Sequence, residues 1–206
     1  MVGCTIDKAT IGRTIAFHGH RCPGLSIGIR ASEIALREVG SSRDEEIVAV
    51  TETDMCAVDA VQFLTGCTFG KGNLLFLDHW KVAFSFFRRS DGRSFRIVAK
   101  HAPRPDDRAR LELRMLIASG RATPEEEKAF DAAQLKRCDL IMEADLDDLF
   151  EIGRVPFALP DRARLFPTLV CDKCGEPFME PRGRFYRGAT LCIACFNRIE
   201  RGVEFL

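Results

Sequence analysis

Four cysteines in the last third of the chain constrain its folding more than any other feature. They form two Cys-x-x-Cys pairs, Cys171 with Cys174 and Cys192 with Cys195, and seventeen residues separate the pairs. Two such pairs are typical of a tetrahedral Zn²⁺ site with four thiolate ligands. We therefore predict a structural zinc module over residues 168–206, and we expect metal binding to supply its folding energy. Four thiolates leave this zinc no open position for catalysis.

Disulfides or unrelated thiols are the alternatives at these four positions. The chain has nine cysteines. Its first seventeen residues lack the basic region and apolar run of a signal peptide. No apolar stretch approaches the roughly 20 residues that span a bilayer. We therefore expect a cytoplasmic protein that does not bind membranes, where cysteines serve metal or thiol chemistry rather than disulfides.

Hydrophobic periodicity, glycine and proline predict an α+β core of helices around a mixed or antiparallel sheet. The expected helices cover residues 5–17, 25–39, 57–64, 108–118 and 123–142. The expected strands cover residues 46–53, 73–77, 81–88 and 94–100. Acidic residues followed by three prolines then indicate a linker. We predict three parts: a core over 1–145, a linker over 146–167 and the zinc module over 168–206.

A short segment of the core carries two histidines and a cysteine at alternate positions, His18, His20 and Cys22. The Pro23-Gly24 pair that follows disfavours a helix here, and an extended segment would place all three side chains on one face. Imidazole and thiolate suit Zn, Ni, Cu or Fe(II) better than Mg or Ca. The residues alone leave two interpretations open, a transition-metal site or a histidine-containing turn beside a buried cysteine.

Two further cysteines, Cys56 and Cys67, flank the predicted helix over 57–64. Whether they meet each other or the first group depends on the fold. Asp59 and Gln62 follow Cys56 at helical spacing, and each could orient a metal ligand through a hydrogen bond. The alternative for each cysteine is the role of a small buried apolar residue.

Nucleic acid is the less favoured partner. The chain contains 30 Lys and Arg residues against 30 Asp and Glu residues, whereas a protein that neutralises phosphates normally presents a basic face. One mixed basic and aromatic cluster lies in the zinc module: Arg182, Arg184, Phe185, Tyr186 and Arg187. We expect this cluster to bind an acidic partner protein rather than duplex DNA.

Two blocks of this sequence resemble the signatures of the formylmethanofuran dehydrogenase E-subunit family. The first is FHGHRCPGL, which begins at Phe17, and the second runs from Glu52 to Asn73. The similarity covers about residues 10–140, and several family members also carry a C-terminal zinc finger. The resemblance implies an α+β fold around a mixed sheet and a homodimer. It also implies a core metal or thiol site built from His18, His20, Cys22, Cys56 and Cys67.

The resemblance indicates function only in outline. Formylmethanofuran dehydrogenase is a molybdenum or tungsten enzyme whose catalytic cofactor lies in other subunits. We therefore expect a metal-binding accessory to such a redox enzyme, with zinc, nickel or iron in the core and a zinc module that contacts a partner. One alternative is a regulator that senses a metal or ligand and whose zinc finger contacts protein or nucleic acid. Another is an independent thiol- or metal-dependent enzyme with Cys22 or Cys67 as nucleophile.

Overall fold

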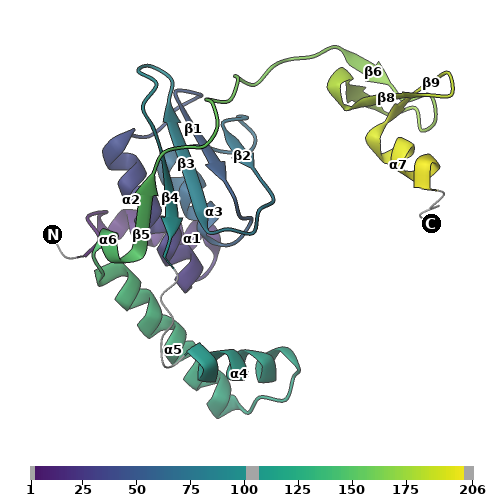
Figure 1. The fold of residues 1–206 in the computed structure, drawn as a ribbon. Helices are drawn as coiled ribbons and strands as arrows, with labels where there is room; N and C mark the ends of the chain where they lie inside the picture. The colour runs from purple at the N-terminus through teal and green to yellow at the C-terminus, as the bar shows by residue number, and fades with distance from the viewer. Residues whose placement is uncertain (1–2, 101–106, 202–206) are drawn as a thin grey trace. The chain divides into compact units, whose positions relative to one another are not determined.

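The computed structural model describes residues 3–100 and 107–201, which form two compact units that meet between Arg162 and Ala163. The first unit has the predicted α+β architecture (Figure 1). Its helices are α1 (Lys8–His18), α2 (Pro23–Glu38), α3 (Ala57–Thr65), α4 (Asp107–Ala118), α5 (Pro124–Glu143) and α6 (Leu146–Leu149). Its strands are β1 (Ile47–Thr51), β2 (Leu74–Phe76), β3 (Ala83–Arg88), β4 (Ser94–Ala99) and β5 (Phe150–Gly153).

The sheet is mixed, as the family resemblance implied. Its strand order is β2-β1-β3-β4-β5, in which β1 and β2 are parallel and the other pairs antiparallel. All five residues of β1 are buried, because both faces of the sheet are covered there. Helices α2 and α3 cover one face, and the chain that follows β5 crosses the other (Figure 1). On that second face the rings of Phe87 and Phe157 lie 5.8 Å apart.

The prediction that residues 146–167 form a linker was wrong for its first eight residues. Residues 146–153 form α6 and β5, and β5 joins the sheet by pairing with β4. Its register places Phe150 opposite Ala99 and Ile152 opposite Ile97. The segment was missed because β5 is a four-residue edge strand with only Phe150 buried, and it follows a run of exposed acidic residues.

Close packing of α2 against α3 decides where the two helices begin. A Cβ at Gly28 would lie 2.3 Å from the carbonyl oxygen of Ala57, so the helix backbones approach too closely for any side chain there. A Cβ at Gly24 would likewise lie 3.2 Å from the Cβ of Cys56. The amino-terminal ends of α2 and α3 are therefore held side by side.

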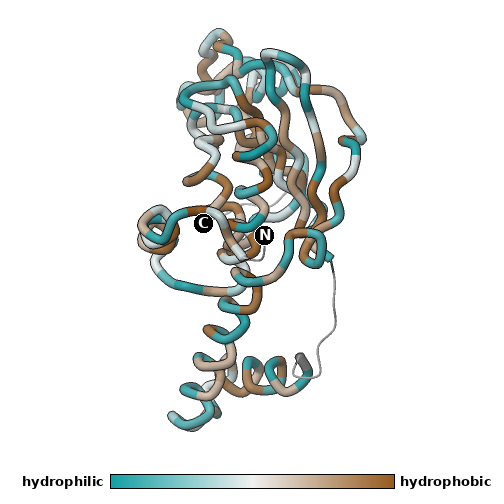
Figure 2. The backbone as a smooth tube through the Cα atoms, turned by 90° about the vertical axis from the view of Figure 1, so that its left-hand side faces the viewer, coloured by the Kyte–Doolittle hydropathy of each residue, from teal (hydrophilic) through white to brown (hydrophobic). Residues whose placement is uncertain are grey.

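Helices α4 and α5 form a hairpin that extends away from the sheet (Figure 1). The turn between them contains Gly120 at φ 66°. The predicted capping box at the start of α5 is present, with Thr123 and Glu126 each accepting a hydrogen bond from the other's backbone amide. Figure 2 shows hydrophobic and hydrophilic residues alternating along this hairpin. Within the described residues, no helix has both the length and the apolar character needed to cross a bilayer.

The second unit is small and built from two hairpins and a helix. Its elements are β6 (Thr168–Val170), β7 (Pro177–Met179), η1 (Glu180–Arg182), β8 (Gly183–Tyr186), β9 (Ala189–Cys192) and α7 (Ile193–Arg201). Its buried cluster comprises only Cys171, Leu191 and Cys195, supported by partly buried neighbours such as Phe178 and Phe196. Residues 202–206 of the predicted module lie outside the described residues. So little apolar burial cannot stabilise a domain by itself.

Candidate metal centres

The four cysteines of the second unit form one cluster, as the sequence predicts. Their sulfurs all lie within 4.8 Å of one another, and those of Cys174 and Cys192 are 4.0 Å apart. Cys171 and Cys174 lie in the turn after β6, while Cys192 ends β9 and Cys195 lies in the first turn of α7. Two tight turns thus direct four thiols at one point, which is the arrangement of a structural zinc site.

The local electrostatics of this cluster favour a bound cation. Backbone amides, including that of Cys192 at 3.3 Å, donate to the sulfur of Cys171 and lower its pKa to about 6. Burial, together with the neighbouring thiols, raises the pKa of Cys195 to about 12. Four thiolates this close repel one another unless a cation lies among them, and Zn²⁺ supplies the charge and geometry that four sulfurs require.

A second cluster lies in the core, where His18, His20, Cys22 and Cys56 place one ligand atom each within 4.8 Å of the others. The rings of the two histidines are 4.5 Å apart, and Nε2 of His18 lies 3.8 Å from Sγ of Cys22. Two imidazoles and two thiolates suit zinc, nickel or iron. The donor set fits the core metal that the sequence predicts.

The structure assembles this cluster differently from the extended segment that the spacing suggested. His18 is the last residue of α1, and Gly19 then turns the chain at φ 95°. Cys22 is the N-cap of α2, where its sulfur accepts a hydrogen bond from the amide of Leu25 at 3.4 Å. Cys56 immediately precedes α3. A helix end, a tight turn and two helix starts bring the ligand atoms together.

Asp59 and Gln62 occupy the supporting positions that the sequence assigned to them. Oδ2 of Asp59 lies 2.7 Å from Nδ1 of His18, which leaves Nε2 of His18 on the side of Cys22. Nε2 of Gln62 donates to Oδ1 of Asp59 at 3.4 Å, and Oε1 of Gln62 accepts from the amide of Phe69 at 3.4 Å. Such a chain fixes the ring orientation of a metal-binding histidine.

The structure does not bring Cys67 to this cluster. Cys67 is fully buried in the main core, where its thiol donates to the carbonyl of Ile47 at 3.5 Å. Burial raises the pKa of this thiol, so it is poorly suited to act as a nucleophile. Gly66, at φ 72°, ends α3 and turns the chain toward β2, which separates Cys67 from Cys56.

Burial also raises the pKa of Cys56, and the neighbouring Cys22 raises it further. Two thiolates side by side would repel each other, so each retains its proton more strongly than an isolated thiol does. A metal ion must displace those protons to bind. Metal affinity at this cluster should therefore rise with pH.

Sequence reasoning missed a buried ionic group at the end of β1. Glu52 is 3% exposed, and its Oε1 accepts from Nε of Arg96 at 2.5 Å while Oε2 lies 3.1 Å from Nδ1 of His79. Arg96, with His79, holds the pKa of Glu52 below its usual value. Glu52 belongs to the second family block, but its partners come from β4 and from the segment before β3, and no local pattern joins them.

Comparison with known proteins agrees with both units. Residues 17–151 match a family described as "FmdE, Molybdenum formylmethanofuran dehydrogenase operon". Residues 164–201 match the prokaryotic dksA/traR C4-type zinc finger. A crystal structure of an FmdE-like protein of tungsten formylmethanofuran dehydrogenase, from Syntrophus aciditrophicus, superposes with a TM-score of 0.62. That comparison covers 100% of both chains at 24% sequence identity, and it supports the fold.

One curated relative comes from Archaeoglobus fulgidus and is named a probable S-adenosyl-L-methionine-binding protein. It is 31% identical over 191 residues, which cover 89% of this chain. The chain spans about half, 51%, of the length of that relative. The match over residues 17–151, which is most of the chain, assigns the family. This chain therefore belongs to the FmdE family and carries a C4-type zinc finger of the dksA/traR kind after its core.

Proposed function

We propose that the core of this protein binds one transition-metal ion through His18, His20, Cys22 and Cys56. The observation that supports this most is the convergence of four soft donor atoms within 4.8 Å from two separate chain segments. Asp59 orients one of the histidines, as carboxylates commonly do beside metal-binding imidazoles. The zinc finger has a different role, because its four thiolates complete their own site and hold the small unit together.

A metal titration of the full chain tests this proposal. We expect two ions per chain, one held tightly by the zinc finger and one held more weakly in the core. Competition with chelators of graded affinity should remove the core ion first. Binding of a single ion per chain would contradict the core site.

We further propose that the protein is accessory to a molybdenum- or tungsten-dependent redox enzyme. The support is the family description, which names the molybdenum formylmethanofuran dehydrogenase operon. Reconstitution of such an enzyme with and without this chain tests the role. We expect a higher activity or metal content with the wild-type chain than with the Cys22→Ser variant, and equal values would contradict it.

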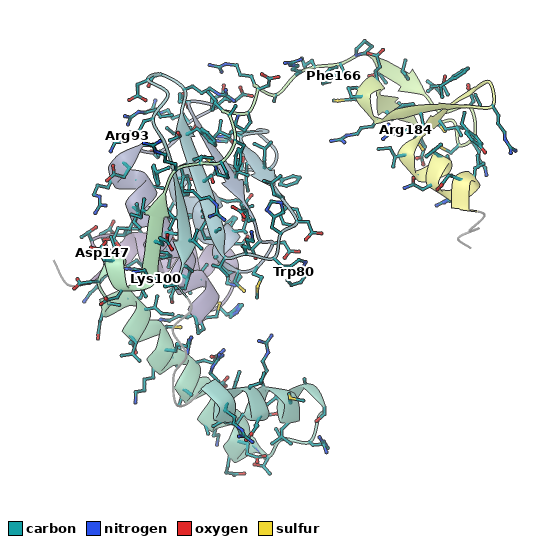
Figure 3. All side chains as sticks on the ribbon, viewed as in Figure 1. Trp80, Arg93, Lys100, Asp147, Phe166 and Arg184 are labelled. Carbon is teal, nitrogen blue, oxygen red and sulfur yellow. The ribbon has the colours of Figure 1, made fainter. Side chains whose placement is uncertain are left out.

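A metal- or ligand-sensing regulator is the second candidate, favoured by the likeness of the second unit to the dksA/traR zinc finger. This unit exposes Phe185, which is 79% exposed, and Arg184, labelled in Figure 3. Arg187 lies over the ring of Tyr186 at 5.1 Å. These side chains could contact either an acidic protein or a nucleic acid.

Duplex DNA binding separates the two candidates. The whole chain has no net charge, so we expect binding no tighter than the non-specific range of about 10⁻⁴–10⁻⁶ M at physiological salt, with a shallow salt dependence. Fluorescence anisotropy at several salt concentrations measures this. A nanomolar complex with one defined duplex, lost in the Arg184→Ala, Arg187→Ala double variant, would instead favour the regulator.

We also propose that two copies of the chain associate through the α4–α5 hairpin. The supporting observation is a set of large apolar side chains that are 44–64% exposed, Leu111, Met115, Leu135 and Leu140. Such side chains favour burial at an interface.

The double variant Met115→Glu, Leu135→Glu tests this association. Because charged side chains resist burial, we expect it to be monomeric in analytical ultracentrifugation while the wild-type chain is a dimer. Lys8→Glu, an exposed position on α1, is the control and should stay dimeric. A wild-type monomer, or a dimeric double variant, would contradict the proposed interface.

A further inference from the structure

A cavity of about 560 Å³ lies next to the residues of the core metal cluster. Gly24 and Ala57 line it, and each lies within two positions of a cluster cysteine. Gly24 packs directly on Cys56, since a Cβ at Gly24 would be 3.2 Å from the Cβ and 3.8 Å from the Sγ of Cys56. One wall of the cavity therefore backs onto the metal cluster.

Basic residues from distant parts of the chain also line this cavity. They are Lys100 after β4, Arg110 in α4 and Arg137 in α5, and the described lining contains a single acidic residue, Asp148. Nζ of Lys100 donates to the carbonyl of Asp147 at 2.6 Å, and Figure 3 shows these two residues close together. The cavity thus has an excess of positive charge within an otherwise neutral protein.

Helix ends add to this positive potential. Helices α2 and α3 both begin at the cavity, with Pro23 and Gly24 in the first turn of one and Ala57 at the start of the other. The amino-terminal end of a helix carries a partial positive charge and attracts anions. The helix ends and the basic side chains favour a ligand of the same charge.

The rest of the lining is largely apolar. Ile27, Met55, Val82, Leu111 and Ile141 contribute side chains to the wall. A volume of about 560 Å³ falls within the usual range of small-molecule sites, which are mostly apolar with a few polar groups that fix orientation. A free phosphate or metal ion would leave most of this apolar surface without contact.

We propose that this cavity binds a small organic anion, with its carboxylate or phosphate held by the basic residues and its apolar part against the wall. A molecule bound in this way also lies beside the core metal cluster, so this cavity supplies the ligand or substrate of the metal centre. The inference deepens the proposed function and, for the role of the metal, rests on it.

Four probes with one hexyl-length chain and different head groups test the charge preference: hexanoate, hexyl phosphate, hexylamine and hexanol. Isothermal titration calorimetry on the zinc-loaded full chain measures their affinities. Because hydrogen bonds to charged groups contribute about 1.5–3 kcal/mol, we expect at least one anion to bind about tenfold or more tighter than hexanol. The two anions identify the preferred head group. Equal affinities for all four probes, or tighter binding of hexylamine, would overturn the inference.

A pair of neighbouring substitutions on α5 locates the binding site. Arg137→Met removes a lining charge but keeps an apolar stem, and Lys136→Met removes an exposed charge from the next position. We expect the first variant to bind the preferred anion about tenfold more weakly, with the affinity for hexanol unchanged, and the second to behave as wild type. Arg137→Lys, which retains the charge, should restore part of the affinity. Equal losses in the two methionine variants would contradict this site.

The same titrations distinguish failure of this inference from failure of the metal centre. Protein carrying Cys22→Ser, with its metal content measured, provides the comparison. If anions bind with the expected preference but no core metal is found in the wild-type chain, the metal centre is wrong and the anion site stands. If the core metal binds and the anions show no preference, the anion site is wrong and the metal centre stands.

Discussion

Replacing Cys174 with serine should release the zinc and unfold the second unit, while the first unit keeps its structure. Serine stays protonated at neutral pH and is not a ligand for structural zinc. The described part of the unit buries only Cys171, Leu191 and Cys195, so little apolar burial remains once the metal is lost. Apparent binding free energies of structural zinc reach about 10–16 kcal/mol, which exceeds what so small a core can provide.

Zinc content and limited proteolysis measure this result. We expect the variant to lose one zinc per chain, and protease to remove residues beyond the core while the fragment containing the first unit survives. Cys4→Ser is the matched control, because Cys4 is a partly buried cysteine outside both metal clusters. Full zinc content in the Cys174→Ser variant would sink the four-thiolate assignment.

The zinc cluster could be predicted from the sequence because its geometry is local. Each Cys-x-x-Cys pair folds as a single turn, and one β-hairpin joins the two pairs. The same holds for most helices, whose limits have local signals. Asp7 caps α1 by accepting a hydrogen bond from Thr10, and Gly19 ends that helix with a positive φ.

The core cluster could be predicted only in part. His18, His20 and Cys22 are neighbours in sequence, but Cys56 joins them because α2 packs against α3 at Gly28. A glycine in a helix is compatible with many roles, and only the helix–helix contact shows its purpose. Cys67 illustrates the converse, since the family resemblance placed it with the site while the structure buries it beside Ile47.

The cavity was not predictable from local patterns at all. Its basic residues, Lys100, Arg110 and Arg137, come from the end of a strand and from two helices. Each is an ordinary charged residue in its own segment. Their shared position depends on how α5 packs against α2 and on how β5 extends the sheet, and the β5 segment has the local pattern of a linker.

Replacing Cys22 with serine should lower the metal affinity of the core at least about tenfold and leave the zinc finger loaded. Cys22 contributes twice to this cluster, as a donor atom and as the N-cap of α2. Serine is itself a good N-cap, so the helix should persist and the loss should fall on the metal. Affinity in the wild-type chain should also decline as pH falls, because the raised pKa of Cys56 makes protons stronger competitors.

Metal titration of both proteins at several pH values, with thiol labelling of Cys22, measures this prediction. Cys67→Ala is the matched control: it removes a buried cysteine that lies outside the cluster, so it should lower stability without changing core metal occupancy. A result in which Cys67→Ala loses the core metal and Cys22→Ser retains it would reverse the ligand assignment. Labelling of Cys22 at the same rate with and without metal would show that its thiol is not a ligand, because a metal-bound thiolate reacts more slowly than a free one.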